Sequence, residues 1–425
     1  MAHGAASTRG DVEVVTFGCR LNAVESDAIR ARATGAGLSG AVIVNTCAVT
    51  AEAERQAAQT IRRLRRDRPG ARIVVTGCAA QIAPAKWAAM PEVDSVLGNM
   101  EKLTTEGYTD GGGRVRVADI MTAPADERAI ASVSGQSRAF LQVQTGCDHR
   151  CTFCVIPFGR GPSRSAPLGE IARLARLAVA AGHSEIVLTG VDLTAFGADL
   201  PGRPTLGEAC RRLLRLVPAL PRLRLSSLDP VEIDDTLIAL LGDEPRLMPH
   251  LHLSAQAGDD MVLKRMRRRH ARGDVLRLVD RVRRVRPGVA FGADLIAGFP
   301  TETDGMFDNT LRLVDEASLT WLHVFPYSAR VGTPAARMPQ VPGDVRRARA
   351  SLLRAAGARR AEAFLRGRIG TRARVVMERD GTGHSEHFAR VRPAFPAPPR
   401  ALVDIDIEGL ADGVLTGRPV ERVAA

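Results

Sequence analysis

Three cysteines lie within eight residues of one another in this 425-residue chain. They are Cys147, Cys151 and Cys154, in a C-x3-C-x2-C spacing that follows the apolar run 140–145. Thiolates gathered in one loop are typical ligands of a soft metal centre. A structural zinc site takes four ligands, often as two C-x2-C pairs, and the local set stops at three. A four-iron cluster held by three cysteines would keep one iron open for another ligand. The alternatives are a zinc knuckle and cysteines with no metal role.

Three further cysteines recur at equivalent places nearer the N-terminus. Each follows a short apolar segment: 12–16 precedes Cys19, 41–45 precedes Cys47, and 72–76 precedes Cys78. Helix-like stretches, expected from Ala23 and again near Ala80, follow these segments, which predicts a parallel α/β sheet. Ligand sites in such sheets lie beyond the carboxyl ends of the strands. We therefore expect the three thiols to meet at one edge and to hold a second cluster; the alternative is three unrelated core cysteines.

The central triplet, with Phe153 before its last cysteine, resembles the signature of radical S-adenosylmethionine (SAM) enzymes. This resemblance implies a [4Fe-4S] cluster on Cys147, Cys151 and Cys154, whose open iron is chelated by the amino and carboxylate groups of SAM. It also implies that Phe153 packs beside the adenine of the cofactor.

The N-terminal motifs are similar to those of the methylthiotransferases, a family of radical SAM enzymes. The similar segments are Thr16–Asn22, Val44–Thr50, Thr76–Gln81 and Val96–Asn99. The resemblance implies that Cys19, Cys47 and Cys78 hold an auxiliary [4Fe-4S] cluster that carries or donates sulfur.

The middle of the chain alternates apolar strands with helices in six units. Six units predict an incomplete (β/α)6 barrel, with functional groups at the carboxyl ends of its strands. The polar residues at these predicted ends are Asp192, Ser226, Ser227, Gln256, Asp294, Tyr327 and Ser328. By resemblance, the residues expected to contact SAM are Gly190, Asp192, Ser226, Gln256 and Asp294.

Two basic segments each allow more than one interpretation. The Gly/Arg loop 157–165 could cap the cluster, approach a substrate phosphate or be a plain connection. The run 264–270 could line an RNA groove or be an exposed helix end. Cys210 lies in an amphipathic stretch and is expected in the core. Four histidines show no ligand spacing: His183, His250, His384 and His387.

Beyond residue 370 the pattern changes to short strands at 373–377, 388–391 and 401–407. About 55 residues of this kind predict a small β-barrel, a fold that often binds RNA. Its position resembles that of the TRAM domain, which closes methylthiotransferases; an assembly role is the alternative. The predicted domains are an N-terminal α/β domain with the auxiliary cluster (1–125), a radical SAM core (136–366) and a TRAM-like RNA-binding domain (367–425).

Composition limits the class of protein further. A formal charge of +12 favours a polyanionic partner such as nucleic acid, although an arginine-rich genome would also raise it. Seven cysteines, an odd number, argue against a disulfide framework. No apolar run is long enough to span a bilayer. Residues 1–11 lack the apolar stretch of a secretory signal, so a cytoplasmic protein is expected.

The resemblance extends over nearly the whole chain and implies a reaction on adenosine 37 of the tRNA anticodon loop. The segment Gly18–Asn22 is similar to the subgroup that acts on N6-threonylcarbamoyladenosine, whereas the ribosomal branch has Pro-Lys after the cysteine. Methylthio insertion at C2 of that adenine is therefore expected. It would use SAM, two [4Fe-4S] clusters and an electron donor such as flavodoxin or ferredoxin. The alternatives are isopentenyladenosine 37, ribosomal protein S12, and a non-catalytic iron–sulfur RNA-binding protein.

Overall fold

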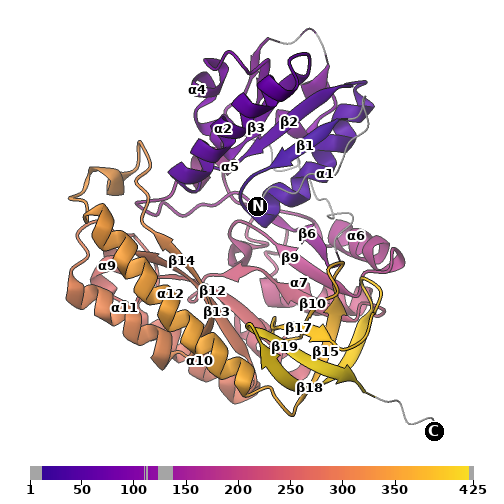
Figure 1. The fold of residues 1–425 in the computed structure, drawn as a ribbon, viewed down its shortest axis with the longest axis vertical. Helices are drawn as coiled ribbons and strands as arrows, with labels where there is room; N and C mark the ends of the chain where they lie inside the picture. The colour runs from indigo at the N-terminus through magenta and orange to yellow at the C-terminus, as the bar shows by residue number, and fades with distance from the viewer. Residues whose placement is uncertain (1–11, 110, 112, 123–136, 421–425) are drawn as a thin grey trace.

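Figure 1 shows three units that follow one another in sequence and pack against each other. The computed structural model describes residues 12–109, 111, 113–122 and 137–420. A sheet with helices on its faces lies at the top, an open barrel in the middle, and a small barrel beside it at the C-terminal end. The segment 1–11, on which the absence of a secretory signal was argued, lies outside the described residues, as does part of the connector, 123–136.

A five-stranded parallel sheet forms the N-terminal unit, with its strands in sequence order. All six residues of β2 are buried, as expected for a parallel strand covered on both faces. The predicted parallel α/β unit is therefore confirmed. The strands are β1 (Glu13–Thr16), β2 (Ala41–Thr46), β3 (Arg72–Gly77), β4 (Ser95–Leu97) and β5 (Val115–Arg116).

Helices in this unit begin closer to the cysteines than the sequence indicated. Helix α1 (Arg20–Gly35) starts directly after Cys19 instead of at Ala23, and α3 (Cys78–Ile82) includes Cys78 itself. Cys19 is thus the N-cap of α1, where the partial positive charge of the helix end favours a thiolate. The other helical segments are α2 (Ala51–Asp67), α4 (Pro84–Ala88), η1 (Glu101–Leu103), η2 (Glu106–Tyr108) and η3 (Ile120–Thr122).

Parallel strands form the wall of the central unit. Strands β6, β9 and β10 make one sheet and β11 to β14 another, but only Ser226 separates β10 from β11, so the two continue as one curved wall. Among the strands that the structure describes, β6 and β14 do not pair, which confirms the incomplete barrel. The strands are β6 (Ala139–Gln142), β9 (Glu185–Thr189), β10 (Arg222–Leu225), β11 (Ser227–Leu228), β12 (His250–Gln256), β13 (Ala290–Ala297) and β14 (Leu319–Pro326).

The apolar run before the cysteine triplet is not one strand. It breaks after β6, and β7 (Gln144–Thr145) pairs antiparallel with β8 (Arg164–Ser165). Backbone hydrogen bonds at Val143 complete the change, because its N–H donates to Thr189 and its carbonyl oxygen accepts from Ala166. The loop that carries Cys147, Cys151 and Cys154 therefore begins at β7 and ends at β8, two strands that lie side by side.

Helices cover the outside of the barrel wall (Figure 1). Cys210 on α7 is fully buried in the core with Leu223 and Phe291, which confirms its predicted packing role. The helical segments are α5 (Ile156–Arg160), α6 (Leu168–Ala180), η4 (Leu193–Ala195), α7 (Leu206–Leu216), α8 (Asp235–Asp243), α9 (Asp260–Arg265), α10 (Arg272–Val285), α11 (Asp304–Glu316), η5 (Pro334–Arg337) and α12 (Gly343–Arg366).

The C-terminal strands close into a barrel in the order β15-β16-β17-β19-β18, as predicted. Its core contains Val375, Val391 and Ile405, all fully buried. The expected strand 388–391 begins only at Arg390, because Phe388 has a φ of 69° and lies outside the ladder. The strands are β15 (Arg372–Met377), β16 (Gly383–His384), β17 (Arg390–Pro393), β18 (Leu402–Ala411) and β19 (Val414–Pro419).

Buried arginines attach this barrel to the central wall. Arg224 pairs with Glu185 at 2.7 Å and donates to the carbonyl oxygens of Ser385 and Glu386 at 3.1 Å. Arg222 reaches the same Glu185 carboxylate at 3.0 Å. Burial opposes ionisation of Glu185, but the two arginines outweigh it and lower its pKa to about 2. One carboxylate therefore balances two buried cations at this interface.

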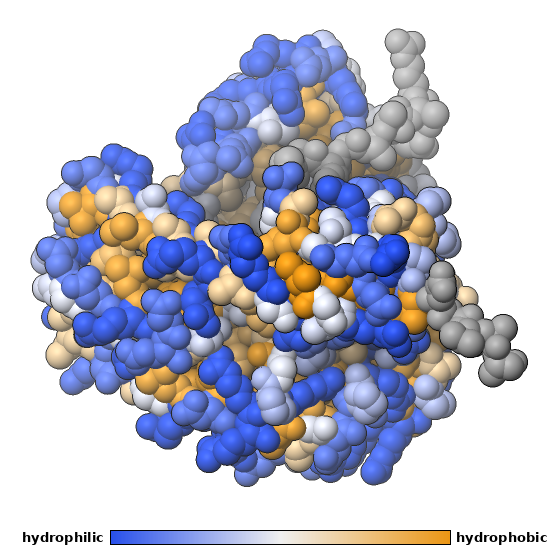
Figure 2. Space-filling view, turned by 60° about the horizontal axis from the view of Figure 1, so that its bottom comes forward, coloured by the Kyte–Doolittle hydropathy of each residue, from blue (hydrophilic) through white to orange (hydrophobic). Residues whose placement is uncertain are grey.

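Hydrophilic residues cover most of the face in Figure 2, and apolar residues appear there in smaller groups between them. The larger apolar cluster lies inside, between the barrel wall and its helices. Within the described ranges, no helix combines the length and apolar character that crossing a membrane would require.

Replacing Glu185 with Gln should destabilise the protein by about 3–5 kcal/mol, because two buried guanidinium groups would lose their common anion. The free energy of unfolding from urea titration measures this loss. Glu170→Gln is the matched control, since it breaks the solvent-exposed pair with Arg173 and should change stability little. Equal effects of the two substitutions would contradict this account of the interface.

Candidate functional site at the strand ends

The three N-terminal cysteines gather at the carboxyl edge of the first sheet. Cys19 follows β1, Cys47 follows β2 and Cys78 follows β3, and these strands are neighbours. Burial raises the pKa of the Cys47 thiol to about 12, and charges on Cys19 and Cys78 add to the increase. Gly18 permits the approach: a Cβ on this residue would lie 2.5 Å from the Cys47 sulfur.

Nitrogen donors point at two of these sulfurs. The Cys47 Sγ accepts a hydrogen bond from the backbone N–H of Val49 at 3.4 Å, and the Cys78 Sγ accepts one from Arg160 Nε at 3.2 Å. Such donors stabilise a thiolate more than a thiol. Cys47 and Cys78 are buried and Cys19 is exposed, and three thiolates with donors of this kind suit a soft metal cluster.

Arg160 belongs to the loop that follows the second cysteine triplet, yet it reaches into the N-terminal unit. Its guanidinium donates to Asn22 Oδ1 at 2.6 Å and pairs with Glu25. Lys102 Nζ lies 2.7 Å from the same Glu25 carboxylate. Burial raises the pKa of Glu25, but Arg160 and Lys102 outweigh it and lower the value to about 2. Within the Gly/Arg loop, the buried Arg160 therefore connects the central unit to Cys78.

The second trio lies in the loop between β7 and α5. The Cys154 Sγ accepts from the backbone N–H of Ile156 at 3.4 Å, and the Cys151 Sγ accepts from Arg268 at 3.6 Å. Burial favours the neutral thiol of Cys151, but a hydrogen bond from His149 and the charge of Arg268 outweigh it and lower its pKa. The basic run 264–270 thus sends one arginine inward to the site.

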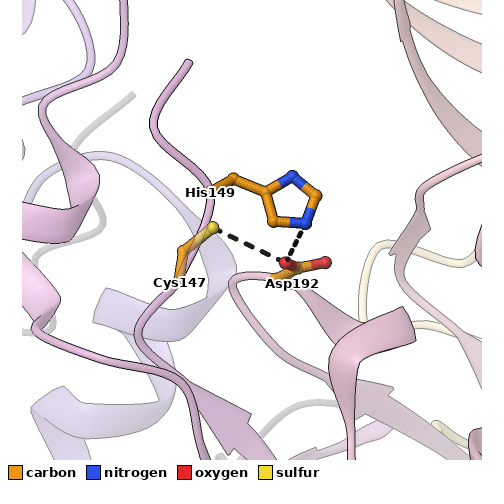
Figure 3. Close-up of side chains that lie close together, drawn as sticks. All are labelled: Cys147, His149 and Asp192. Atoms are coloured by element: carbon orange, nitrogen blue, oxygen red, sulfur yellow. Dashed lines mark hydrogen bonds and ion pairs between the residues drawn. The ribbon is translucent and has the colours of Figure 1, made fainter. Parts of the chain in front are cut away.

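Figure 3 shows Cys147, His149 and Asp192 converging. Cys147 Sγ lies 3.5 Å from Asp192 Oδ2, and His149 Nε2 lies 3.3 Å from the same oxygen. Burial, followed by the Asp192 charge, raises the pKa of the Cys147 thiol. A hydrogen bond with Cys151, then one with Glu232, raises the pKa of His149 to about 10. A thiolate at Cys147 thus requires a cation beside it.

The two trios lie close to each other. Burial raises the pKa of the Cys154 thiol to about 11, and negative charge on Cys151 and on Cys78 of the other trio adds to the increase. Gly159 fills the contact: a Cβ on it would lie 3.2 Å from the Cys78 Cβ. The strand ends of the two sheets therefore face a common region.

A cavity of about 240 Å³ lies between the N-terminal unit and the barrel. Three of the residues expected to contact SAM line it: Phe153, Gln256 and Asp294. Val49 and Thr50 line it from the N-terminal unit. Polar groups set among apolar walls suit a nucleoside-sized ligand.

Two histidines fix the carboxylate of Asp294. His252 Nε2 and His323 Nδ1 each lie 3.1 Å from Asp294 Oδ1. Burial opposes ionisation, but hydrogen bonds with the two rings hold the pKa of Asp294 well below its usual range. The carboxylate is therefore charged and oriented at neutral pH.

The other residues expected to contact SAM, Gly190, Asp192 and Ser226, do not line this cavity. Gly190 packs on Gln144, where a Cβ would come within 2.8 Å of the side-chain oxygen. That oxygen accepts the backbone N–H of Asp192 at 2.9 Å, so Gln144 positions the turn beside Cys147. The Ser226 hydroxyl is buried and has no hydrogen-bond partner among the described residues.

Sequence reasoning missed Arg160, Arg268 and His149 beside the sulfurs, and His252 and His323 beside Asp294. The first two lie in basic segments that were noted, but nothing in a local pattern shows which arginine points inward. The alternation of His250 and His252 along a predicted strand was an available signal for an inward-facing histidine.

Each trio fits a cluster with three protein ligands. In each trio two of the three sulfurs accept hydrogen bonds from nitrogen donors, and no fourth cysteine in the described residues joins either trio. The cavity borders both trios, because Phe153 directly precedes Cys154 and Val49 and Thr50 closely follow Cys47.

Comparisons with known proteins agree with this arrangement. Residues 141–314 match the radical SAM superfamily, and residues 11–98 match a family described as uncharacterized protein family UPF0004. The threonylcarbamoyladenosine tRNA methylthiotransferase MtaB of Rickettsia prowazekii is 50% identical over 381 residues, covering 89% of this chain and 90% of that protein. The tRNA-2-methylthio-N(6)-dimethylallyladenosine synthase of Novosphingobium aromaticivorans is 37% identical, covering 87% and 86%.

A solved structure supports the fold independently. The radical S-adenosylmethionine methyltransferase TsrM from Kitasatospora setae superposes with a TM-score of 0.52 at 17% identity, covering 73% of this chain and 67% of that one. At this identity the likeness concerns the fold alone.

The contribution of Glu25 to stability should depend on pH. Its folded pKa of about 2 lies below the ordinary value of 4.5, so its stabilisation is present above pH 4.5 and is lost as the pH falls toward 2. The difference in unfolding free energy between the wild type and Glu25→Gln should therefore shrink over that window. Urea titrations at several pH values measure it, and a difference that stays constant would contradict the role assigned to Arg160 and Lys102.

Proposed function

The chain belongs to the radical SAM methylthiotransferase family, and from this premise we propose that it inserts a methylthio group at C2 of N6-threonylcarbamoyladenosine 37 in tRNA. The observation that carries this assignment is 50% identity over nine tenths of both chains with a threonylcarbamoyladenosine tRNA methylthiotransferase. The dimethylallyladenosine synthase, at 37% identity, supplies the second candidate substrate. The enzyme class is the same in both cases.

The radical SAM domain implies SAM and a [4Fe-4S] cluster, and we assign that cluster to Cys147, Cys151 and Cys154. We further propose a second cluster on Cys19, Cys47 and Cys78. When bound, the two clusters and SAM supply the radical and the sulfur that the reaction needs. The gathering of the N-terminal trio at one sheet edge, and the donors on its Cys47 and Cys78 sulfurs, support the auxiliary site.

The protein's own groups hold these sites and balance their charge. Arg268 and His149 lie against Cys151 and stabilise its thiolate. Arg160 donates a hydrogen bond to the Cys78 sulfur and pairs with Glu25, and so it ties the two units together. Because both sets of thiolates are partly buried, these cations offset the cost of placing negative charge away from water.

The cavity is proposed as the place of the SAM adenosine. Phe153 meets Phe299 edge to face, with ring centres 6.2 Å apart, which holds the Phe153 ring at the cavity wall. Gln256 and the charged Asp294 offer polar contacts. Gly190 and Asp192 form the turn beside Cys147, and Ser226 has a buried hydroxyl. We propose that these three residues also contact SAM.

The partner is tRNA, which the names of the relatives imply. Adenosine 37 would have to leave the stack of the anticodon loop to reach a site between the two units. We propose that the closed C-terminal barrel and the net positive charge serve RNA binding. We also propose a cytoplasmic enzyme that takes its electron from flavodoxin or ferredoxin.

Substitutions in the two trios should have different effects on SAM cleavage and on sulfur insertion. Cys19→Ala should retain cleavage of SAM but abolish sulfur insertion, because only the auxiliary cluster is lost; Cys151→Ala should abolish both. Each variant should retain about half of the iron of the wild type. The readouts are 5′-deoxyadenosine, methylthiolated nucleoside and iron content after anaerobic reconstitution, with Cys210→Ala as a matched cysteine control. Equal loss of SAM cleavage in Cys19→Ala and Cys151→Ala would contradict the assignment.

Deletion of the gene tests the substrate. Nucleosides from tRNA of the deletion strain should lack the 2-methylthio derivative of N6-threonylcarbamoyladenosine, while the unmethylthiolated nucleoside accumulates. Mass spectrometry of digested tRNA measures both. Loss of the 2-methylthio dimethylallyl derivative, or of methylthiolation on a ribosomal protein instead, would reject the proposed substrate.

A further inference from the structure

A group of arginines lies around two aromatic rings, Phe140 of β6 and Phe388 of the C-terminal barrel. The guanidinium carbons of Arg20 and Arg138 each lie 5.7 Å from the ring centre of Phe140. Those of Arg20, Arg138 and Arg224 lie 5.7, 5.2 and 5.3 Å from the ring centre of Phe388. Three positive charges are thus brought together from three different segments of the chain.

Carboxylates balance two of these charges but not the third. Arg224 is paired with Glu185, and Arg138 lies 3.2 Å from Glu378. Arg20 has no carboxylate partner among the described residues; its contacts are with the two rings.

Two observations indicate that this group faces a ligand. The Arg20 residue is exposed, although aromatic rings lie beside it. Arg138 is mostly buried, with 11% of its side chain exposed, and its Nε and Nη1 donors have no hydrogen-bond partner among the residues that the structure describes. Buried donors without an acceptor are costly, and an anion shared between these two arginines would satisfy them.

The location ties this group to the reaction. Arg20 directly follows Cys19, the first residue of the N-terminal trio. Asp294, which lines the cavity with Phe153 and Gln256, is near enough to attract the Arg20 charge. An anion bound here would lie between the N-terminal trio and the cavity.

We propose that Arg20, assisted by Arg138, binds the carboxylate of the threonylcarbamoyl group on the substrate adenosine; this inference rests on the function proposed above. A guanidinium suits a carboxylate because it can donate two parallel hydrogen bonds. The dimethylallyl group of the second candidate substrate is uncharged and has no hydrogen-bond acceptor. Arg20 is therefore a residue that determines which modified adenosine is accepted.

A phosphate of the tRNA backbone offers the same anionic chemistry, so the test must separate the two. A pair of synthetic anticodon stem-loops does so. One carries N6-threonylcarbamoyladenosine at position 37, and the other carries the same nucleoside with the threonine carboxylate replaced by a carboxamide. Their phosphates are identical, so only a carboxylate subsite distinguishes them.

The reconstituted full-length enzyme should prefer the carboxylate stem-loop by about 10- to 100-fold in kcat/KM, the loss typical of one hydrogen-bonded charge. Arg20→Gln should lower kcat/KM for the carboxylate stem-loop to the carboxamide level and leave the carboxamide rate unchanged. Affinity measured by fluorescence anisotropy should change in parallel. Arg32→Gln, an exposed arginine in the last turn of the same helix, should change neither, and iron content verifies that the neighbouring cluster is retained.

Equal loss on both stem-loops in Arg20→Gln would overturn the proposal in favour of a phosphate contact or a structural role. An absence of preference in the wild type would also overturn it, and that comparison needs no variant. If the wild type modified only a stem-loop with dimethylallyladenosine, the proposed function itself would be rejected, and the subsite with it.

Discussion

The ion pair between Arg160 and Glu25 is the interaction on which the site depends. It is buried, with 4% and 2% of the two side chains exposed, and it joins the loop after one cysteine triplet to the helix after Cys19. Lys102 leaves the group with an excess of positive charge, and Arg160 directs part of that charge at Cys78. Apolar side chains could stabilise such an interface equally well. The ion pair in addition fixes which residues of the two units lie against each other.

A single topological rule explains why this junction contains chemistry. The loops that follow parallel strands all begin at the same edge of the sheet, the carboxyl edge. The N-terminal sheet and the open barrel each have such an edge, and the two edges face each other. Gly18 and Gly159 allow the close contacts at Cys47 and Cys78. The cavity between the units follows from this arrangement, since both edges contribute to its lining.

The sequence predicts those parts of the structure that produce a periodic pattern of apolar residues. The parallel sheet, the incomplete barrel, the closed C-terminal barrel and the buried Cys210 all follow from apolar spacing. Strand pairs of two residues, such as β7 with β8, leave no such trace, and neither does Phe388, whose positive φ moves it out of a strand. The partners of the sulfurs were missed because Arg160 and Arg268 act over 82 and 117 residues of sequence separation, where no local pattern applies. The contacts of individual residues with SAM and tRNA stay predictions.

We propose that the two cysteine trios, which Arg160 brings close together, each hold an iron–sulfur cluster at the junction of the two units. Anomalous diffraction at the iron edge from anaerobically reconstituted crystals tests this most directly. The account predicts two separate iron peaks, one at Cys19, Cys47 and Cys78 and one at the central triplet, with no backbone between them. A single peak, or zinc scattering at the N-terminal trio, would contradict it.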